Sequence, residues 1–69
     1  MTFLQWCRDQ SRRADSVGDF SRDWCADRER PRAPSQAQLV EYLEDHGAIE
    51  DAIRAGIRCY NEWRLLGRP

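Results

Sequence analysis

Apolar side chains recur at steps of three and four residues in four separate stretches of this 69-residue chain. This spacing places them on one face of an α-helix, whereas strict alternation would indicate strands. The longest stripe runs from Ile49 to Leu66, over more than four helical turns. The pattern therefore predicts an all-α fold, with helices near residues 3–12, 16–28, 35–46 and 48–66.

Capping signals support these helix boundaries. Three hydroxyl-bearing residues stand at the starts of the first three helices, each with a capping-box partner three residues further on: Thr2 with Gln5, Ser16 with Asp19, and Ser35 with Gln38. Gly47 and Gly67 follow the third and fourth helices, where glycine closes the last turn. Gly56 lies within the fourth helix, where it lowers helix propensity but is expected to let another helix approach closely.

The length of the chain limits it to one helical domain, residues 1–69, with a small core. Hydrophobic residues make up 41% of the sequence and charged residues 33%, which is typical of a globular protein. No apolar run is long enough for a signal peptide or a membrane span. We therefore expect no membrane association and a cytoplasmic location.

Residues that carry enzyme chemistry are sparse. Cys7, Cys25 and Cys59 are widely spaced and include no C-x-x-C pair, so we expect small buried apolar residues rather than a disulfide framework. With His46 they would make a Cys3His zinc site, but the closely spaced ligand pairs of such sites are missing. A cysteine–histidine pair is the enzymatic alternative, whereas His46 near a helix end is more simply a capping group. We expect no enzymatic activity, cofactor or metal.

Charge is balanced overall but unevenly placed. The chain has eleven basic residues, all arginine, and twelve acidic residues, which gives a net charge of −1 and a pI near 5.7. Four acids recur every four residues on the polar face of the second helix, where like charges repel: Asp15, Asp19, Asp23 and Asp27. We predict that the last two lie near arginines, the local candidates being Arg22, Arg28 and Arg30. We interpret this stripe as a solvated, salt-bridged face; the alternative is a surface that docks a basic partner or mimics nucleic-acid phosphates.

The connector between the second and third helices, residues 27–36, reads DRERPRAPSQ. Pro31 and Pro34 disfavour helix in the residues just before them. Arginines on both sides of the second helix are the candidate nucleic-acid contacts: Arg12, Arg13, Arg28, Arg30 and Arg32. A nucleic-acid-binding domain usually has a basic patch and a pI above about 9, so we favour pairing of these arginines with nearby acids. A second possible basic patch comprises Arg54, Arg58, Arg64 and Arg68.

Three Trp, two Phe and two Tyr compete for the small core, so one or two of them are expected to be partly exposed. Trp, Tyr and Arg commonly anchor protein interfaces. The candidate protein-contact residues are Tyr60, Trp63 and Arg64 near the chain end, and Trp6. The alternative for each aromatic residue is a place in the core. An exposed aromatic residue would also serve self-association, so a monomer and a weak homodimer both stay open.

Together these segments resemble a known family. The first helix contains TFLQWC, the second contains DSVGDFSRDWCAD and precedes a proline connector, the third contains LVEYLEDHGA, and the fourth contains AGIRCYNEWRLL. They are similar to the YozE-like family of small bacterial and phage-associated proteins, from Thr2 to about Leu66. The resemblance implies a sterile-alpha-motif-like fold, a compact bundle of four or five helices with a long C-terminal helix. The family usually has an aromatic residue where this chain has Arg30, so a small core contact is expected to be lost.

The family has no established enzymatic activity, and sterile-alpha-motif-like bundles include both protein-interaction modules and nucleic-acid binders. We therefore expect a small non-enzymatic interaction module in the bacterial cytoplasm that binds another protein. Nucleic-acid binding through the arginines around the 27–36 connector is the alternative.

Overall fold

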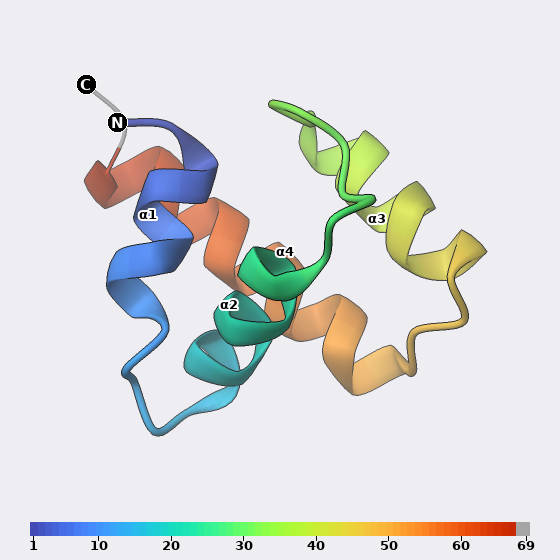
Figure 1. Ribbon diagram of the computed structural model, residues 1–69, viewed down its shortest axis with the longest axis horizontal. Coiled ribbons are helices and arrows are strands. Elements are labelled where there is room, and N and C mark those ends of the chain that lie inside the picture. Colours follow the sequence, from blue (N-terminus) through green and yellow to red (C-terminus); the bar gives the residue numbers. More distant parts are fainter. Residues whose placement is uncertain (68–69) are drawn as a thin grey trace.

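The computed structural model describes residues 1–67, which contain four α-helices: α1 (Phe3–Gln10), α2 (Ser16–Ala26), α3 (Gln36–Asp45) and α4 (Glu50–Glu62). A π-helical turn, η1 (Trp63–Gly67), continues α4 and makes the C-terminal helical segment the longest one (Figure 1). Residues 1–67 contain no strand. The all-α prediction is confirmed, and each helix lies where the hydrophobic spacing placed it. Arg68, from the second arginine group, lies outside the described residues.

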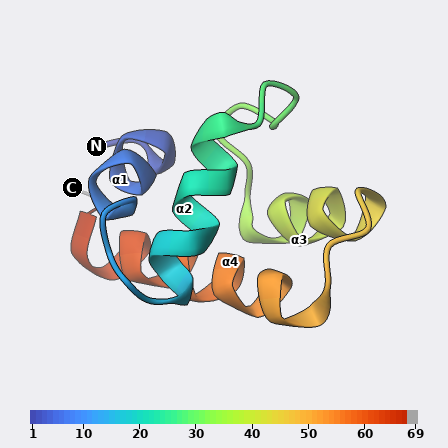
Figure 2. The same cartoon turned by 60° about the horizontal axis from the view of Figure 1, so that its bottom comes forward.

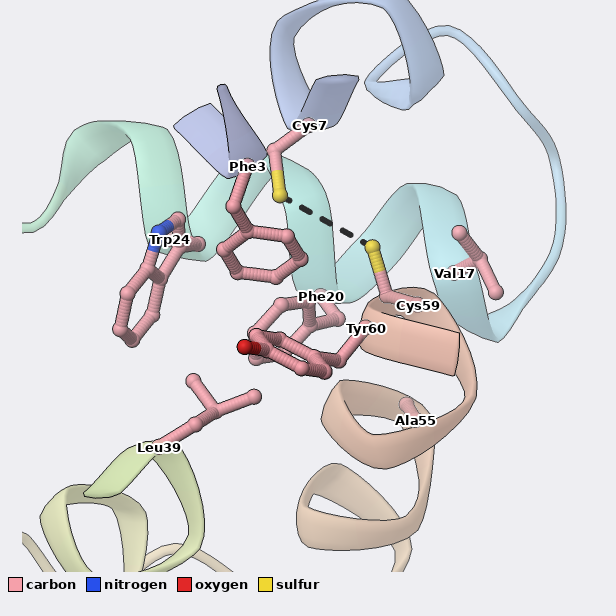
Figure 3. Close-up of a cluster of buried hydrophobic side chains, with 9 residues drawn as sticks. All are labelled: Phe3, Cys7, Val17, Phe20, Trp24, Leu39, Ala55, Cys59 and Tyr60. Carbon is pink, nitrogen blue, oxygen red and sulfur yellow. Dashed lines mark hydrogen bonds between the residues drawn. The ribbon is translucent and has the colours of Figure 1, made fainter. Parts of the chain in front are cut away.

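The centre of the bundle is the crossing of α2 over α4 (Figure 2). α1 packs against α2 and η1 at one end of α4, and α3 packs against α4 at the other end. The core lies between these four helices (Figure 3) and contains Phe3, Cys7, Val17, Phe20, Trp24, Leu39, Ala55, Cys59 and Tyr60. Within residues 1–67, every helix is too short or too polar to cross a membrane.

The first and third helices begin at the predicted capping boxes. Thr2 Oγ1 accepts a hydrogen bond from the Gln5 amide at 3.1 Å, and Gln5 Oε1 accepts one from the Thr2 amide at 2.8 Å. Ser35 and Gln38 form the same reciprocal pair, at 3.1 and 2.9 Å. Two otherwise unpaired amides are satisfied at each helix start, which confirms both predictions.

The start of α2 differs from the prediction. Asp15, rather than Ser16, is the N-cap, and its Oδ1 accepts a hydrogen bond from the Gly18 amide at 3.0 Å. Ser16 is exposed and is the first residue inside the helix. An aspartate caps as well as a serine does, and its negative charge also interacts favourably with the helix N-terminus. The prediction that Ser16 caps this helix with Asp19 as its partner was therefore wrong.

The end of α3 follows the prediction for Gly47. This residue has a φ of 72°, a left-handed conformation that glycine adopts without steric cost. The Gly47 amide donates to the Glu44 carbonyl at 3.1 Å, and the Ala48 amide donates to the Leu43 carbonyl at 3.0 Å. This pair of bonds is a Schellman motif, which ends α3 and turns the chain toward α4.

Gly56 lies where α4 meets α2 and α3. A Cβ atom at this position would lie 2.9 Å from Cε1 of Phe20 and 3.0 Å from Cδ1 of Leu43. A methyl group there would overlap both side chains, so only glycine allows this packing. The expectation that Gly56 lets another helix approach closely is therefore confirmed.

Candidate interaction groove

A hollow of about 1090 Å³ lies between the start of α1, the connector from α2 to α3, and the end of α4. We call it the connector groove. Four aromatic residues line it: Phe3, Trp24, Tyr60 and Trp63. Three arginines of the connector also line it: Arg28, Arg30 and Arg32. None of its lining residues within 1–67 is acidic, so this part of the groove carries a net positive charge in a chain whose total charge is −1.

The three arginines of the groove differ in how they are held. Arg30 is half-buried, and its Nη1 donates to the carbonyl of Asp27 at 2.5 Å and to that of Cys25 at 3.4 Å. It therefore satisfies carbonyl groups at the C-terminus of α2. Arg28 and Arg32 are exposed, and neither side chain has a hydrogen bond or ion pair with any residue of the range 1–67. These two guanidinium groups are available to a ligand.

Aromatic side chains fix the walls of the groove. The Tyr60 hydroxyl donates to the Pro34 carbonyl at 3.0 Å and so ties the connector to α4. The Trp63 Nε1 donates to the Met1 carbonyl at 3.0 Å. The Trp63 ring also lies 5.6 Å from that of Phe3, centroid to centroid. The connector on one side of the groove and the start of the chain on the other are thus both held by residues near the end of the C-terminal helical segment.

The four predicted protein-contact residues do not form one group. Tyr60 belongs to the core with 8% of its surface exposed, whereas Trp63 is half-buried, and both line the connector groove. Arg64 is exposed but does not line the groove. Trp6 is half-buried, packs close to Gly67, and has an Nε1 that is buried without a hydrogen-bond partner in the described part of the chain. Of these residues, Trp63 combines partial exposure with a place in the groove.

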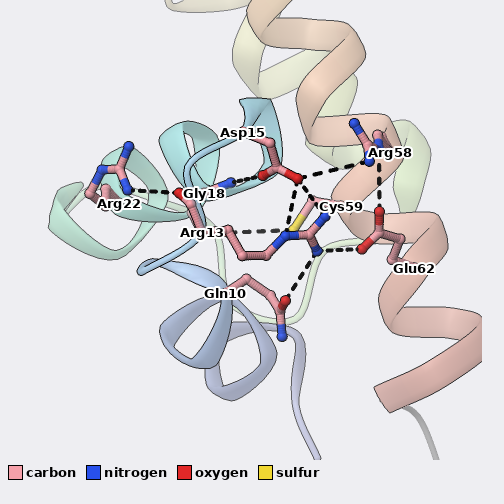
Figure 4. Close-up of polar contacts among 9 residues, drawn as sticks. Gln10, Arg13, Asp15, Gly18, Arg22, Arg58, Cys59 and Glu62 are labelled. Atoms are coloured by element: carbon pink, nitrogen blue, oxygen red, sulfur yellow. Dashed lines mark hydrogen bonds and ion pairs between the residues drawn. The ribbon is translucent and has the colours of Figure 1, made fainter.

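Arg13, one of the predicted nucleic-acid contacts, instead forms an intramolecular cluster (Figure 4). Its guanidinium lies 2.7 Å from Oδ2 of Asp15 and 2.6 Å from Oε1 of Glu62. Arg58 approaches the same two carboxylates, at 3.9 and 3.2 Å. The hydrogen bond from the Gly18 amide, followed in size by that from Arg13, lowers the pKa of Asp15 below its ordinary value. The hydrogen bond from Arg13 likewise lowers the pKa of Glu62. No local pattern in the sequence predicts this cluster, because Arg13 and Glu62 are 49 residues apart.

The five arginines predicted to contact nucleic acid therefore lie in two separate groups. Arg12 and Arg13 precede α2, and Arg28, Arg30 and Arg32 follow it, so the two groups lie at opposite ends of this helix (Figure 2). Arg12 is exposed, and Arg13 is neutralised by two carboxylates. The structure does not bring the five side chains onto one face free of acids. It brings only the three connector arginines together.

The aspartate stripe of α2 forms ion pairs at its first two positions. Asp15 pairs with Arg13, and Asp19 pairs with Arg22 three residues further on. Within residues 1–67, no arginine forms an ion pair with Asp23 or Asp27. The prediction that an arginine lies nearby is confirmed for Asp27, because Arg30 donates to its backbone carbonyl and helps to lower the pKa of its carboxyl group. Arg28 lines the groove instead.

Asp27 has a tyrosine partner instead. Its carboxylate accepts a short hydrogen bond from the Tyr42 hydroxyl and another from the Glu29 amide at 2.9 Å. The hydrogen bond from Tyr42 has the larger effect, and together the two bonds lower the pKa of Asp27. The same contact raises the pKa of Tyr42 to about 12, because the phenolate would face a carboxylate. The connector is thereby fastened to α3.

A second hollow, of about 440 Å³, lies between α2, the end of α3 and the start of α4. Its acidic lining residues are Asp19, Asp23, Asp27 and Asp51, and its apolar ones include Phe20, Trp24 and Leu43. Among the residues that the structure describes, no basic side chain lines it. Trp24 lines both hollows, so this one side chain separates a positively charged groove from a negatively charged one.

The candidates for enzymatic or metal chemistry are not brought together. The His46 ring packs on Tyr42 with centroids 4.0 Å apart, its Nε2 lies 3.9 Å from Oε2 of Glu29, and its backbone caps α3. Cys7 contacts Cys59 instead of a histidine. Residues 1–67 contain no group of three or more His, Cys, Asp or Glu side chains that could hold a metal ion.

No protein-family model, curated protein or solved structure matches this chain. The similarity to the YozE-like family therefore stays a prediction based on the segments quoted above.

Proposed function

We propose that this chain is a small non-enzymatic interaction module that binds an acidic segment of another protein in the connector groove. One observation carries the proposal: the exposed Arg28 and Arg32 and the half-buried Trp63 line a hollow of about 1090 Å³ that has no acidic side chain among its lining residues in the range 1–67. Guanidinium groups bind carboxylates through two parallel hydrogen bonds, and arginine and aromatic residues are frequent anchors of protein interfaces.

The connector is suited to hold these arginines in place before a partner binds. Pro31 and Pro34 restrict their own φ angles, and the carbonyl of Pro34 is held by Tyr60. Arg30 is fastened to the end of α2. The backbone of the connector therefore has little freedom left to lose on binding, and only the side chains of Arg28 and Arg32 have to be ordered.

The aromatic residues of the groove favour a protein over a single-stranded nucleic acid. Phe3, Trp24 and Tyr60 are 4%, 3% and 8% exposed, so their ring faces are not open for stacking on bases. Arg28 and Arg32 supply only two unpaired cations, and so few phosphate contacts give weak binding that salt abolishes. An acidic peptide with one apolar residue can bind through contacts to Arg28 and Arg32 and to the exposed edge of Trp63.

The proposed setting follows the expectations from the sequence. We place the module in the bacterial cytoplasm, where its three free thiols would stay reduced, and as a monomer or weak homodimer. An association with phage rests on the family resemblance alone.

Fluorescence anisotropy tests the proposal directly. A labelled peptide rich in Asp and Glu with one or two aromatic residues is titrated with the protein, and labelled single-stranded DNA is titrated in parallel. The double variant Arg28→Gln/Arg32→Gln is expected to bind the peptide at least about tenfold more weakly, because two charge-assisted hydrogen bonds are lost. The matched control is Arg8→Gln/Arg12→Gln, which removes two exposed arginines outside the groove and should change Kd less than about twofold.

Two outcomes would overturn the proposal. Equal weakening in both double variants would mean that the peptide responds only to net charge. Tighter binding of DNA than of peptide, with a steep salt dependence and loss in Arg28→Gln/Arg32→Gln, would assign the groove to nucleic acid.

A further inference from the structure

Two buried cysteines from opposite ends of the chain are in contact in the core (Figure 3). Cys7 on α1 and Cys59 on α4 are 52 residues apart in sequence, and their Sγ atoms lie 3.8 Å apart. Both side chains are fully buried, with 0% of their surface exposed. A disulfide requires an S–S distance of about 2.05 Å, so bond formation needs the sulfur atoms to approach by less than about 2 Å.

The surroundings of the two thiols are unequal. Cys59 Sγ also lies 3.6 Å from the buried hydroxyl of Ser21 on α2, and Arg13 is nearby in the same region (Figure 4). Hydrogen bonding to Cys59 and burial raise the pKa of Cys7. The hydrogen-bond contact with Cys7, and then that with Ser21, oppose the effect of burial at Cys59 and lower its pKa. Of the two cysteines, Cys59 therefore loses its proton more readily and is the nucleophile of the pair.

We propose that Cys7 and Cys59 are a site of reversible oxidation that closes to an intramolecular disulfide when the chain meets a hydroperoxide. The Cys59 thiolate attacks one oxygen of the O–O bond, which gives a sulfenic acid at Cys59 and releases hydroxide that takes a proton to become water. The Cys7 thiol then attacks the sulfenic sulfur, which forms the S–S bond and releases the second water. Two thiols are oxidised by two electrons in total, and one hydrogen peroxide is reduced to two waters.

The fold provides a route by which the oxidant reaches these sulfur atoms. α1 has only eight residues, carries Cys7 and packs against α2 and η1, so its separation from the bundle would expose the sulfur atoms of Cys7 and Cys59. Local opening at such an element costs less than global unfolding. The reaction is therefore slow in the native protein, and reclosure of α1 returns the two sulfur atoms to contact.

The disulfide would fasten α1 to α4 and restrict the unfolded chain across most of its length. Cross-linking residues 52 apart is expected to raise Tm by more than about 10 °C in a domain of this size. Oxidation would thus make a marginally stable small domain more resistant to thermal unfolding, and a thiol reductant would reverse the change.

Peroxide treatment of the full chain tests the proposal. The protein is incubated with hydrogen peroxide, the remaining thiols are alkylated with N-ethylmaleimide after unfolding, and peptides are mapped by mass spectrometry. We expect a Cys7–Cys59 linkage in the wild type and in Cys25→Ser, a higher Tm for both, and reversal by dithiothreitol. Ser21→Ala should form the same linkage at least about threefold more slowly, because Cys59 loses a hydrogen-bond donor.

Cys25 is the internal control, because it is half-buried and free but has no cysteine contact in the described residues. Oxidation confined to Cys25, including dimers linked through it, would overturn the proposal. So would full alkylation of Cys7 and Cys59 after treatment, or a Cys7–Cys59 linkage that leaves Tm unchanged.

Discussion

Arg13 and Glu62 form an ion pair, with Nη1 and Oε1 2.6 Å apart, that joins the loop before α2 to the last turn of α4. The side chains are 31% and 23% exposed, so the pair lies partly out of water. Gln10 and Asp15 accept further hydrogen bonds from the same guanidinium. One arginine that the sequence offered as a nucleic-acid contact therefore connects three segments of the fold.

Glu62→Gln is expected to lower the free energy of unfolding by about 1 kcal/mol at pH 7, since solvent still screens the pair. Because the folded-state pKa of Glu62 is depressed, this contribution is present above the ordinary glutamate pKa of about 4.3 and is lost as the pH falls through the lower, folded-state value. Urea unfolding of both proteins between pH 7 and pH 3 measures the difference. Glu41→Gln, at an exposed acid of α3, is the control and should leave stability unchanged. A difference that persisted at low pH would contradict the ion-pair explanation.

Asp15→Ala and Ser16→Ala distinguish the observed N-cap of α2 from the predicted one. Asp15→Ala should lower Tm by about 4–8 °C, because the Gly18 amide loses its acceptor. Ser16→Ala should change Tm by less than about 2 °C, since Ser16 lies inside the first turn. Asp15→Asn keeps the capping oxygen but loses the charge that faces Arg13 and Arg58, so an intermediate Tm is expected. Equal losses in the two alanine variants would contradict the assignment of Asp15 as the cap.

Trp63→Ala separates a packing role from a binding role for the most exposed aromatic residue of the groove. The ring contacts Phe3 and Tyr60 at centroid distances of 5.6 and 5.2 Å, and Nε1 holds the Met1 carbonyl. We expect a loss of about 3 kcal/mol in unfolding free energy, measured by denaturant titration. Leu65→Ala in the same π-turn is the control, because Leu65 is 82% exposed and should cost less than about 0.5 kcal/mol. If Trp63→Ala kept the stability of the wild type, the ring would not be needed for packing, and its role would be contact with a partner.

The Tyr42–Asp27 hydrogen bond makes a prediction at high pH. The phenol of Tyr42 should titrate near pH 12, and Asp27→Asn should return its pKa toward 10. The stability that this bond contributes is present below pH 10 and is lost as the pH rises toward 12. Ultraviolet absorbance of the phenolate measures the titration, while circular dichroism monitors the fold. In Glu44→Gln, which changes an exposed acid of α3, the titration should match the wild type.

The helices and most of their ends could be predicted from the sequence. Thr2, Ser35 and Gly47 act where they were expected, and Gly56 allows the predicted close approach. At α2, Ser16 was predicted as the N-cap but Asp15 is the cap, since local preference does not distinguish an aspartate from a serine at this position. Asp15 also faces Arg13 and Arg58, and this contact forms only when the loop packs against α4.

The candidate site was predictable only in part. The connector arginines were identified from their spacing, but whether each one is free depends on where its neighbours fold. Tyr60 was a candidate contact residue, yet its ring lies in the core and its hydroxyl holds the connector.

The sequence by itself determined the four helices, three of their caps and the proline connector, because these features depend on groups within about four residues of one another. The tertiary structure decided that Arg13 is neutralised while Arg28 and Arg32 are free, and that Cys7 meets Cys59. Those outcomes depend on side chains brought together from positions 49 and 52 residues apart, and no local pattern specifies which distant groups will share a surface or a core.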